Sequence, residues 1–310
     1  MIDLKITLPE HFLDEEERCG YTVSNTMKKV WAVELDLLAQ LLSVAEKYNL
    51  KVLATGGTML GAVRHHGFIP WDDDIDVRMH REDYNILCRV AQQEFKAPYF
   101  FQTTETELGA PLGCAKLRNS QTTAFLRSKG DTKRYNQGIF IDIFPYDTVT
   151  MDDKAFMRQR RKCRRLKFLT NLMKWLASAY SPNYTGWKGK LVTFCHVVLG
   201  RFIERHQLEL KFFRRLEKEC QRYNSEPTGA ISPLSFVGFN KKYIKYLAEE
   251  EPAIMMPFEF LSIPVSSGYD RELRAQYGDY LTPVQAKSMH GQVFFDPDRA
   301  YTEYLKERDG

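Results

Sequence analysis

Four aspartates within five positions, residues 72–74 and Asp76, have the clearest potential for chemistry in this chain. Carboxylates packed this closely repel one another, so the cluster either binds a cation or lies in water as a solvated acidic loop. Apolar residues frame it, at 68–71 before the cluster and at Ile75 and Val77 within and after it. Because this frame is not typical of a solvated loop, we expect a metal site at the edge of a buried sheet.

A glycine pair precedes the aspartates by about one helix length. Gly56 and Gly57 follow a short strand expected at 50–54 and lead into a helix expected at 58–65. The first backbone amides of a helix bind phosphate, and glycine lets the phosphate approach closely. The glycine turn and the carboxylates together predict a site where phosphate and a divalent cation are bound side by side.

The most apolar strand of the sequence, expected at 138–145, carries a single carboxylate, Asp142. A buried aspartate is costly unless hydrogen bonds or a cation compensate it. Two interpretations stay open. Backbone amides satisfy Asp142, or strand pairing brings it beside Asp74 and Asp76, which share one face if they lie on a strand. Ligands that are all oxygen favour Mg²⁺ or Mn²⁺ over zinc.

Hydrophobic periodicity predicts the elements that must position these residues. We expect helices at 34–48, 58–65, 81–95, 152–179 and 190–223, a final helix from about 297, and strands at 50–54, 99–103, 114–118, 122–126 and 138–145. The predicted class is α+β, a mixed sheet flanked by helices with a helical insertion or subdomain. The expected division is a catalytic core at 30–150, a basic and aromatic helical subdomain at 151–225, and a C-terminal segment at 226–310 that completes the site.

Composition excludes several classes of protein. The chain is 44% hydrophobic and 27% charged with a formal charge of +4, as in an ordinary globular protein with a mild preference for anionic partners. Its six cysteines form no CxxC pair, and its N-terminus lacks a signal pattern. The longest apolar run, 191–199, is well short of the ~20 residues of a membrane span. We expect a cytoplasmic protein with no nucleic-acid partner, whose membrane contact would be peripheral, at the inner face.

Seven lysines and arginines crowd into residues 158–167. This basic run is explained by solvated helix faces. It is explained equally well by either of two functions, binding of an anionic acceptor or binding of an anionic membrane surface. At a membrane surface each cation would contribute about 1 kcal/mol. The sequence leaves these alternatives open.

Three segments resemble the signature of the LicD family: GGTMLGAVR at 56–64, GFIPWDDDIDV at 67–77 and GIFIDIFP at 138–145. Further matches lie at 116–120, 122–123, 269–270 and 277–280. The order of glycine turn, Asp-x-Asp and later apolar strand is that of the polymerase-β-type nucleotidyltransferase fold. The family includes bacterial phosphocholine transferases and is related to the fukutin group of phosphoribitol transferases. The resemblance covers 30–148 well and 258–295 more loosely.

The resemblance implies a metal-dependent transferase with a CDP-alcohol donor, CDP-choline being favoured. The phosphorylated alcohol would move to a hydroxyl of a cell-surface glycan precursor, such as lipopolysaccharide or teichoic acid, and CMP would be released. The acceptor would be a glycan or a lipid-linked glycan. Two rivals stay open: a nucleotidyltransferase that uses a nucleoside triphosphate, and a non-catalytic glycan- or nucleotide-binding member of the fold.

The resemblance also implies roles for individual residues. The metal ligands and catalytic residues would be Asp74, Asp76 and Asp142, with Asp72 as a further ligand. The donor phosphates would be bound by Gly56, Gly57, Thr58, Lys116 and Arg118. Contacts to the substrate are expected from Arg64 and His290.

Overall fold

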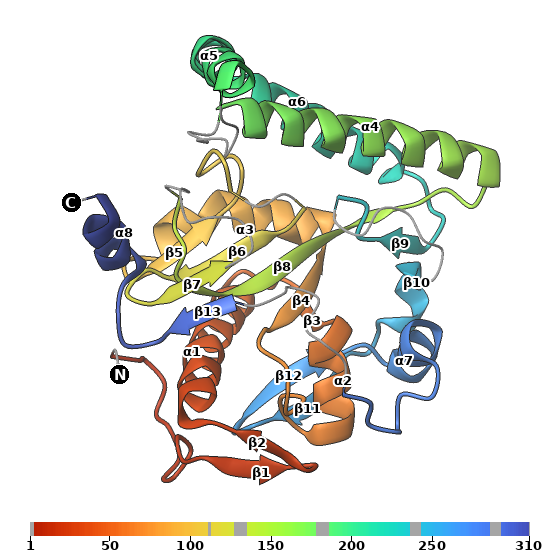
Figure 1. The fold of residues 1–310 in the computed structure, drawn as a ribbon. Helices are drawn as coiled ribbons and strands as arrows, with labels where there is room; N and C mark the ends of the chain where they lie inside the picture. Colours follow the sequence, from red (N-terminus) through yellow and green to blue (C-terminus); the bar gives the residue numbers. More distant parts are fainter. Residues whose placement is uncertain are drawn as a thin grey trace.

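The computed structural model describes residues 3–110, 113–126, 135–177, 186–235, 243–285 and 293–309. A mixed sheet lies at the centre, with helix α1 on one side and a layer made of α4, α5 and α6 beyond the other, above the sheet in Figure 1. The prediction of a mixed sheet flanked by helices is therefore confirmed. Within the described residues, no helix has the length and apolar content needed to cross a bilayer.

The central sheet places the strands that carry the aspartates in its middle. Its described strands are β3 (Leu53–Ala54), β4 (Asp76–His80), β5 (Tyr99–Gln102), β6 (Ala115–Asn119), β8 (Ile139–Thr148), β9 (Ala230–Ser232) and β10 (Lys245–Tyr246). The order is β10-β9-β8-β4-β3, and β6 pairs with both β5 and β8. Only β4 and β8 run parallel among these pairs; the others are antiparallel.

Three small antiparallel pairs surround the sheet. They join β1 (Glu16–Arg18) to β2 (Tyr21–Val23), β11 (Ile254–Phe258) to β12 (Leu261–Val265), and β7 (Thr123–Leu126) to β13 (Val293–Asp296). The last pair connects a strand of the first half of the chain to one near its end. The C-terminal segment therefore returns to the core.

The described helices differ in several places from those predicted. They are α1 (Asn25–Lys47), α2 (Gly56–His65), α3 (Arg81–Glu94), α4 (Asp153–Ala177), α5 (Gly186–Arg205), α6 (Leu208–Cys220), α7 (Tyr269–Tyr277) and α8 (Tyr301–Asp309), with short 3₁₀ turns η2 (Gln221–Tyr223) and η4 (Leu247–Glu249). The segment predicted as one helix at 190–223 is two helices. The chain breaks at Gln207, whose φ is +49°, a conformation that a continuing helix cannot contain.

Helix α1 begins nine residues before the predicted start at 34. The side chain of Ser24 caps it by accepting a hydrogen bond from the Met27 amide at 3.3 Å. Lys28, Glu34 and Asp36 are buried in it. Lys28 precedes the predicted start and interrupts the apolar pattern although it lies inside the protein, and this is why periodicity placed the start too late.

Ion pairs attach the helical layer to the sheet, and a small hydrophobic core holds the layer itself together. Arg81, at the start of α3, pairs with Asp147 of β8 at 2.7 Å and also with Glu217 of α6. Within the layer, α4 and α6 pack through a buried cluster that includes Phe156 and Leu216. The layer is thus anchored on the strand that carries Asp142.

Candidate functional site

Asp76 and Asp142 are brought together by the parallel pairing of β4 and β8. The register sets the two residues opposite each other, and the Asp142 amide donates a hydrogen bond to the Ile75 carbonyl at 2.8 Å. On the other side of β8, the register of β6 sets Lys116 opposite Asp142. Three charged residues therefore lie in a row across the sheet.

The Asp142 carboxylate has a cationic partner within the protein. Lys116 Nζ donates to Asp142 Oδ1, and both residues are buried. The ammonium also lies 3.6 Å from the centre of the Phe140 ring. Of the two interpretations drawn from the sequence, satisfaction by backbone amides is not found among the described residues, where a lysine compensates the charge instead. The role of Asp142 as a metal ligand stays a prediction.

Backbone hydrogen bonds hold Asp76 in place, but one oxygen of its carboxylate has no hydrogen-bond partner among the described residues. Its amide donates to Thr58 Oγ1 at 2.7 Å, and its carbonyl accepts from the Thr55 amide at 3.1 Å. Its buried Oδ1 has no hydrogen-bond partner among the described residues. Burial, and then the charges of the neighbouring aspartates, raise the pKa of Asp76 well above its usual range. A cation at this oxygen would remove the cost of that arrangement.

The first three aspartates form a separate cluster before the strand. Carboxylate oxygens of Asp72, Asp73 and Asp74 all lie within 4.8 Å of one another. Because β4 begins at Asp76, the expectation that Asp74 and Asp76 share a face of one strand is wrong; Asp74 belongs to the preceding loop. The loop is fixed from below, where Trp31 Nε1 of α1 donates to the Asp72 carbonyl at 3.1 Å.

A sixth carboxylate lies near this loop, and sequence reasoning missed it. Glu34 of α1 is only 1% exposed, and its Oε2 has no partner among the described residues. Burial and the charges of Asp74, Asp73 and Asp72 raise its pKa well above the usual range. Its place inside an apolar helix was the available signal, since a buried glutamate there needs a reason.

The glycine turn touches the carboxylates directly. A Cβ atom on Gly57 would lie 2.6 Å from Asp72 Oδ2, and one on Gly56 would lie 3.3 Å from Asp76 Oδ2. Gly56 also has a φ of +58°, which favours glycine. The glycine turn and the aspartates therefore lie side by side, as the sequence predicts. Thr58, in the same first turn of α2, holds Asp76 through its hydroxyl.

The two cations predicted to bind phosphate have different surroundings. Lys116 belongs to the cluster through Asp142. Arg118 is 3% exposed and donates to Gln102 Oε1 and to the Gly138 carbonyl, each at 2.6 Å. Burial lowers the pKa of Arg118. These bonds hold Nε and Nη1 of Arg118, whereas Lys116 lies beside a site carboxylate.

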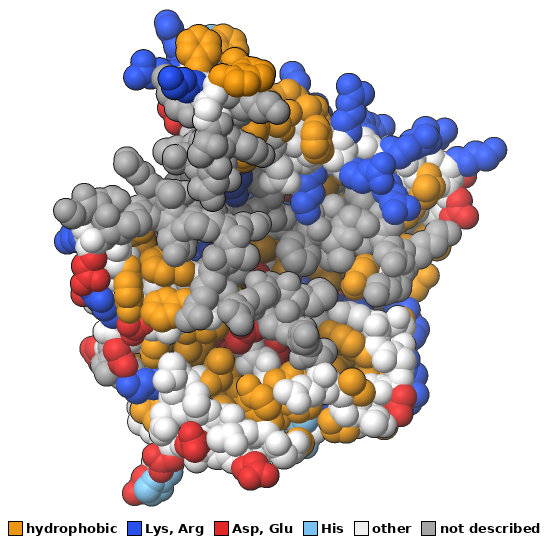
Figure 2. All heavy atoms as spheres, in the orientation of Figure 1, with side chains coloured by type: hydrophobic (Ala, Val, Ile, Leu, Met, Phe, Trp, Pro, Cys, Tyr) orange, Lys and Arg blue, Asp and Glu red, His pale blue; other side chains and the backbone are white. Residues whose placement is uncertain are grey.

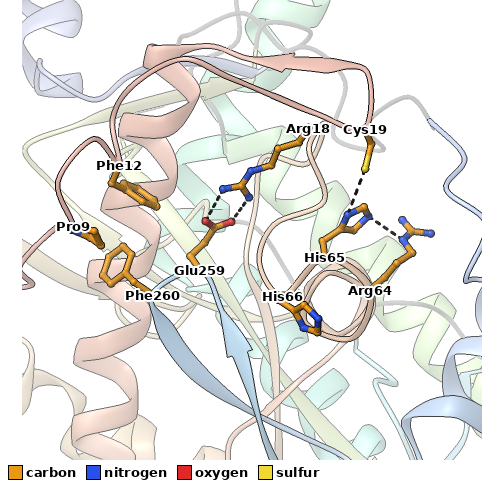
Figure 3. A pocket seen from close by; sticks show the side chains of 9 residues that line it. All are labelled: Pro9, Phe12, Arg18, Cys19, Arg64, His65, His66, Glu259 and Phe260. Atoms are coloured by element: carbon orange, nitrogen blue, oxygen red, sulfur yellow. Dashed lines mark hydrogen bonds and ion pairs between the residues drawn. The ribbon is translucent and has the colours of Figure 1, made fainter.

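Arg64 lies at the far end of α2 from the glycines. It donates to the Tyr280 carbonyl at 2.6 Å and to His65 Nε2 at 2.9 Å. Burial and the charge of Arg64 lower the pKa of His65 to about 4. Arg64 and His65 line a separate cavity of about 580 Å³ that also contains the Arg18–Glu259 ion pair (Figure 3). The other predicted substrate contact, His290, lies outside the described residues.

The C-terminal segment reaches the site through Tyr277, which sequence reasoning did not assign. This tyrosine ends α7 and its side chain is partly exposed. Burial of its hydroxyl, and then the charges of Asp76 and Asp72, raise its pKa. The signal in the sequence was the Tyr-Gly-Asp-Tyr turn, in which Tyr277 is the first residue.

A buried ion network positions α7 and so Tyr277. Arg78 lies two residues after Asp76 on β4 and donates to both oxygens of Glu272 at 2.6 and 2.9 Å. Lys245 Nζ lies 2.9 Å from the same carboxylate. Burial alone would raise the pKa of Glu272, but the charges and hydrogen bonds of Arg78 and Lys245 together outweigh it and lower the pKa to about 2. One strand therefore carries both a site aspartate and the arginine that anchors α7.

Comparisons with known proteins agree with this geometry. The family described as LicD/FKTN/FKRP, nucleotidyltransferase domain, matches residues 49–177, which contain the glycine turn, the aspartates and Asp142. The lipopolysaccharide cholinephosphotransferase LicD of Haemophilus influenzae is 30% identical over 272 residues, 86% of this chain and 96% of that protein. An uncharacterized protein of Rickettsia prowazekii is 38% identical over 81 residues, 26% of this chain and 29% of its own length.

The similarity to the Haemophilus protein extends well beyond the matched domain and spans nearly all of that relative. It confirms the resemblance drawn from the glycine and aspartate motifs. The chain therefore belongs to the LicD family and is an enzyme of the LicD type.

Proposed function

We propose that this enzyme transfers phosphocholine from CDP-choline to a hydroxyl group of a lipopolysaccharide-type glycan precursor and releases CMP. The observation that carries the proposal is the contact between Gly57 and the Asp72 carboxylate, because it sets a helix N-terminus and the aspartates at one spot. The name of the Haemophilus relative supports choline phosphate as the group and lipopolysaccharide as the acceptor.

We assign the core to the polymerase-β-type nucleotidyltransferase fold. Its support is the order of the glycine turn, the Asp-x-Asp and a third aspartate, with the β4–β8 register setting Asp76 opposite Asp142. The division proposed is a catalytic core at 30–150, a helical subdomain at 151–225 and a completing segment at 226–310. We place the protein in the cytoplasm, at the inner face of the membrane.

The carboxylates fit a divalent cation, Mg²⁺ or Mn²⁺, because every candidate ligand is an oxygen. The buried Oδ1 of Asp76, which lacks a hydrogen-bond partner among the described residues, supports this assignment. The proposed ligands are Asp72, Asp74, Asp76 and Asp142, and the structure adds Asp73 to the candidates. When bound, the cation would neutralise charge on the transferred phosphoryl group.

Residues of the chain would bind the donor and position the reacting groups. The amides at Gly56, Gly57 and Thr58 would bind and orient the diphosphate. Lys116 would hold Asp142 in place and supply positive charge beside it. The acceptor oxygen would bond to the choline-bearing phosphorus, the bond from that phosphorus to CMP would break, and the hydroxyl proton would leave to a base. Catalysis would rest on positioning and on charge neutralisation.

Product analysis tests the proposal. Purified protein would be incubated with Mg²⁺ and CDP-linked choline, ethanolamine, glycerol or ribitol, with release of CMP as the readout. We expect turnover with CDP-choline and its loss in an Asp76→Asn control. Pyrophosphate released from nucleoside triphosphates would instead identify a nucleotidyltransferase. The absence of any turnover, even with a lipopolysaccharide precursor present, would identify a non-catalytic binding protein.

A further inference from the structure

Helix α5 carries a stripe of large apolar side chains on its exposed surface. The members are Trp187 at 72% exposure, Leu191 at 53%, Phe194 at 64%, Val198 at 48% and Phe202 at 53%. Consecutive members are four, three, four and four residues apart, so they lie along one side of the helix. Single exposed apolar residues are common on proteins, but a continuous row of this size marks an interaction surface.

The opposite side of α5 packs against the protein. Gly200 is buried, and a Cβ atom there would lie 3.0 Å from the Leu176 carbonyl of α4. Ile203, on the same side, is 4% exposed. The stripe therefore points away from the fold. Figure 2 shows orange side chains at the top of the molecule, where Figure 1 places α5, with blue side chains beside them.

The helices that carry and support this stripe are rich in positive charge. Helices α4 and α5 together contain thirteen lysines and arginines and two acidic residues, whereas the whole chain has a formal charge of only +4. The cations Lys190, Arg201 and Arg205 of α5 are exposed. In the described part of the chain, none of these three has a carboxylate partner, and the same holds for Arg161, Arg164 and Arg165 of α4.

We propose that α5 docks the protein on an anionic lipid bilayer. The helix lies flat on the surface, the stripe enters the head-group region, and the cations of α4 and α5 contact lipid phosphates. An apolar face with aromatic residues, bordered by lysine and arginine, is the pattern of interfacial helices. The concentrated positive charge opposes the pairing of two such faces, so a second copy of the chain is disfavoured as the occupant. The inference goes beyond the proposed reaction and does not depend on the donor.

Vesicle binding tests the inference with the full chain and no nucleotide. We expect sedimentation with vesicles of phosphatidylcholine and phosphatidylglycerol, and much less with phosphatidylcholine alone. The double variant Leu191→Gln/Phe194→Gln should bind at least about tenfold more weakly. The matched control Leu108→Gln/Met255→Gln changes side chains of similar exposure outside the helical layer and should bind as wild type does. Equal binding by the stripe variant and the control would overturn the proposal.

A charge variant separates the electrostatic part from the apolar part. Lys190→Gln/Arg201→Gln/Arg205→Gln should reduce binding to the anionic vesicles and flatten its dependence on salt. All three side chains are exposed, so the fold should be unaffected. Binding that stays insensitive to both salt and these substitutions contradicts docking on an anionic surface.

Fluorescence reports whether the stripe enters the bilayer. In a Trp175→Phe background, Trp187 is the strongly exposed tryptophan, because Trp31 is fully buried and Trp71 is half-buried. We expect a blue shift on addition of anionic vesicles and quenching by lipids brominated near the head group. A shift that instead follows protein concentration without vesicles would show self-association through α5 and overturn the proposal.

Activity measurements keep this inference apart from the proposed function. The stripe lies outside the glycine and aspartate site, so the double variant should release CMP from CDP-choline without acceptor as wild type does. Vesicle binding without turnover of any CDP-alcohol would leave the docking intact and reject the proposed reaction. Turnover without α5-dependent binding would do the reverse.

Discussion

Asp76 and Asp142 lie opposite each other in register on parallel strands, yet of the two only Asp142 has a cationic partner among the residues that the structure describes. Lys116 is bonded to Asp142, whereas Asp76 keeps a buried oxygen without a partner among the described residues. The protein compensates one carboxylate and leaves the other to repulsion from its neighbours. This asymmetry predicts different consequences for the two side chains when each is neutralised.

Asp76→Asn should lower turnover by about two to three orders of magnitude, since it removes charge from the reacting centre. The melting temperature of the metal-free protein should hold or rise, because burial and neighbouring aspartates already disfavour the charged form. Turnover assays and thermal melts in a chelator check both expectations. An exposed control, Asp14→Asn, should change neither, and near-normal turnover of Asp76→Asn would remove that residue from the site.

Asp142→Asn should also abolish turnover, but it should destabilise the fold. The substitution leaves the Lys116 ammonium buried without its partner, and breaking such a pair costs about 3 kcal/mol. Urea unfolding measures the loss. The double variant Asp142→Asn/Lys116→Met should recover most of the stability and none of the turnover. If the single variant is as stable as wild type, the ion pair has no structural role.

Gly57→Ala should weaken donor binding by at least about tenfold while the helix remains intact. The new Cβ would lie 2.6 Å from Asp72 Oδ2, so the carboxylate must move. Alanine favours the helical conformation over glycine by about 1 kcal/mol, so the melting temperature should not fall. Calorimetric titration with CDP-choline measures the affinity. An unchanged affinity would show that the turn and Asp72 do not form one site.

Much of the fold and part of the site could be predicted from the sequence. The strand at 138–145, the helix at 81–95 and the closeness of the glycines to the aspartates follow from periodicity and motif order, which are local properties. The place of Trp31 and Glu34 at the site could not be predicted: a glutamate within an apolar helix was a signal of some special role, but both residues meet the aspartate loop only through tertiary packing. Lys116 was predicted as a phosphate ligand, but its pairing with Asp142 depends on strand register.

Tyr277→Phe should lower turnover by about tenfold without changing the melting temperature. Burial, and then the charges of Asp76 and Asp72, raise the pKa of the Tyr277 hydroxyl. Among the described residues, the only hydrogen-bond partner of this hydroxyl is Gln276 Nε2, at 3.0 Å. A contact to substrate would explain a partly exposed tyrosine at this place. Steady-state kinetics check the expectation, with Tyr246→Phe as the exposed control. Equal rates for all three proteins would assign Tyr277 a structural role only.

The contribution of Glu34 to the free energy of unfolding of the metal-free protein should fall as pH rises above about 4.5, whereas that of His65, with a pKa of about 4, rises until pH reaches its unfolded value of 6.5. Glu34 has a folded-state pKa well above its unfolded value of 4.5. Its stabilising contribution is therefore complete below the unfolded pKa and is lost as pH rises through the folded one. Asp76 acts in the same direction. Glu272 has a pKa of about 2, so its stabilising contribution is complete above pH 4.5 and does not change at higher pH.

The substitution Glu34→Gln isolates the contribution of Glu34 to this pH dependence. The variant cannot ionise at this position, so the unfolding free energy of wild type should fall relative to that of the variant as pH rises. Urea unfolding in the presence of a chelator at several pH values measures both slopes. Parallel curves for wild type and variant would show that Glu34 does not titrate over these pH values.

Mg²⁺ or Mn²⁺ should be required for turnover and should also raise the melting temperature. The cation would bind the folded site and not the unfolded chain, so saturation at a hundred times the dissociation constant would stabilise by about 2.7 kcal/mol. The rise should shrink in Asp74→Asn and Asp76→Asn, because each removes a charged oxygen from the cluster. It should persist in Asp14→Asn. Full turnover in chelated buffer, with no shift in melting temperature on adding the metal, would show that these aspartates act without a cation.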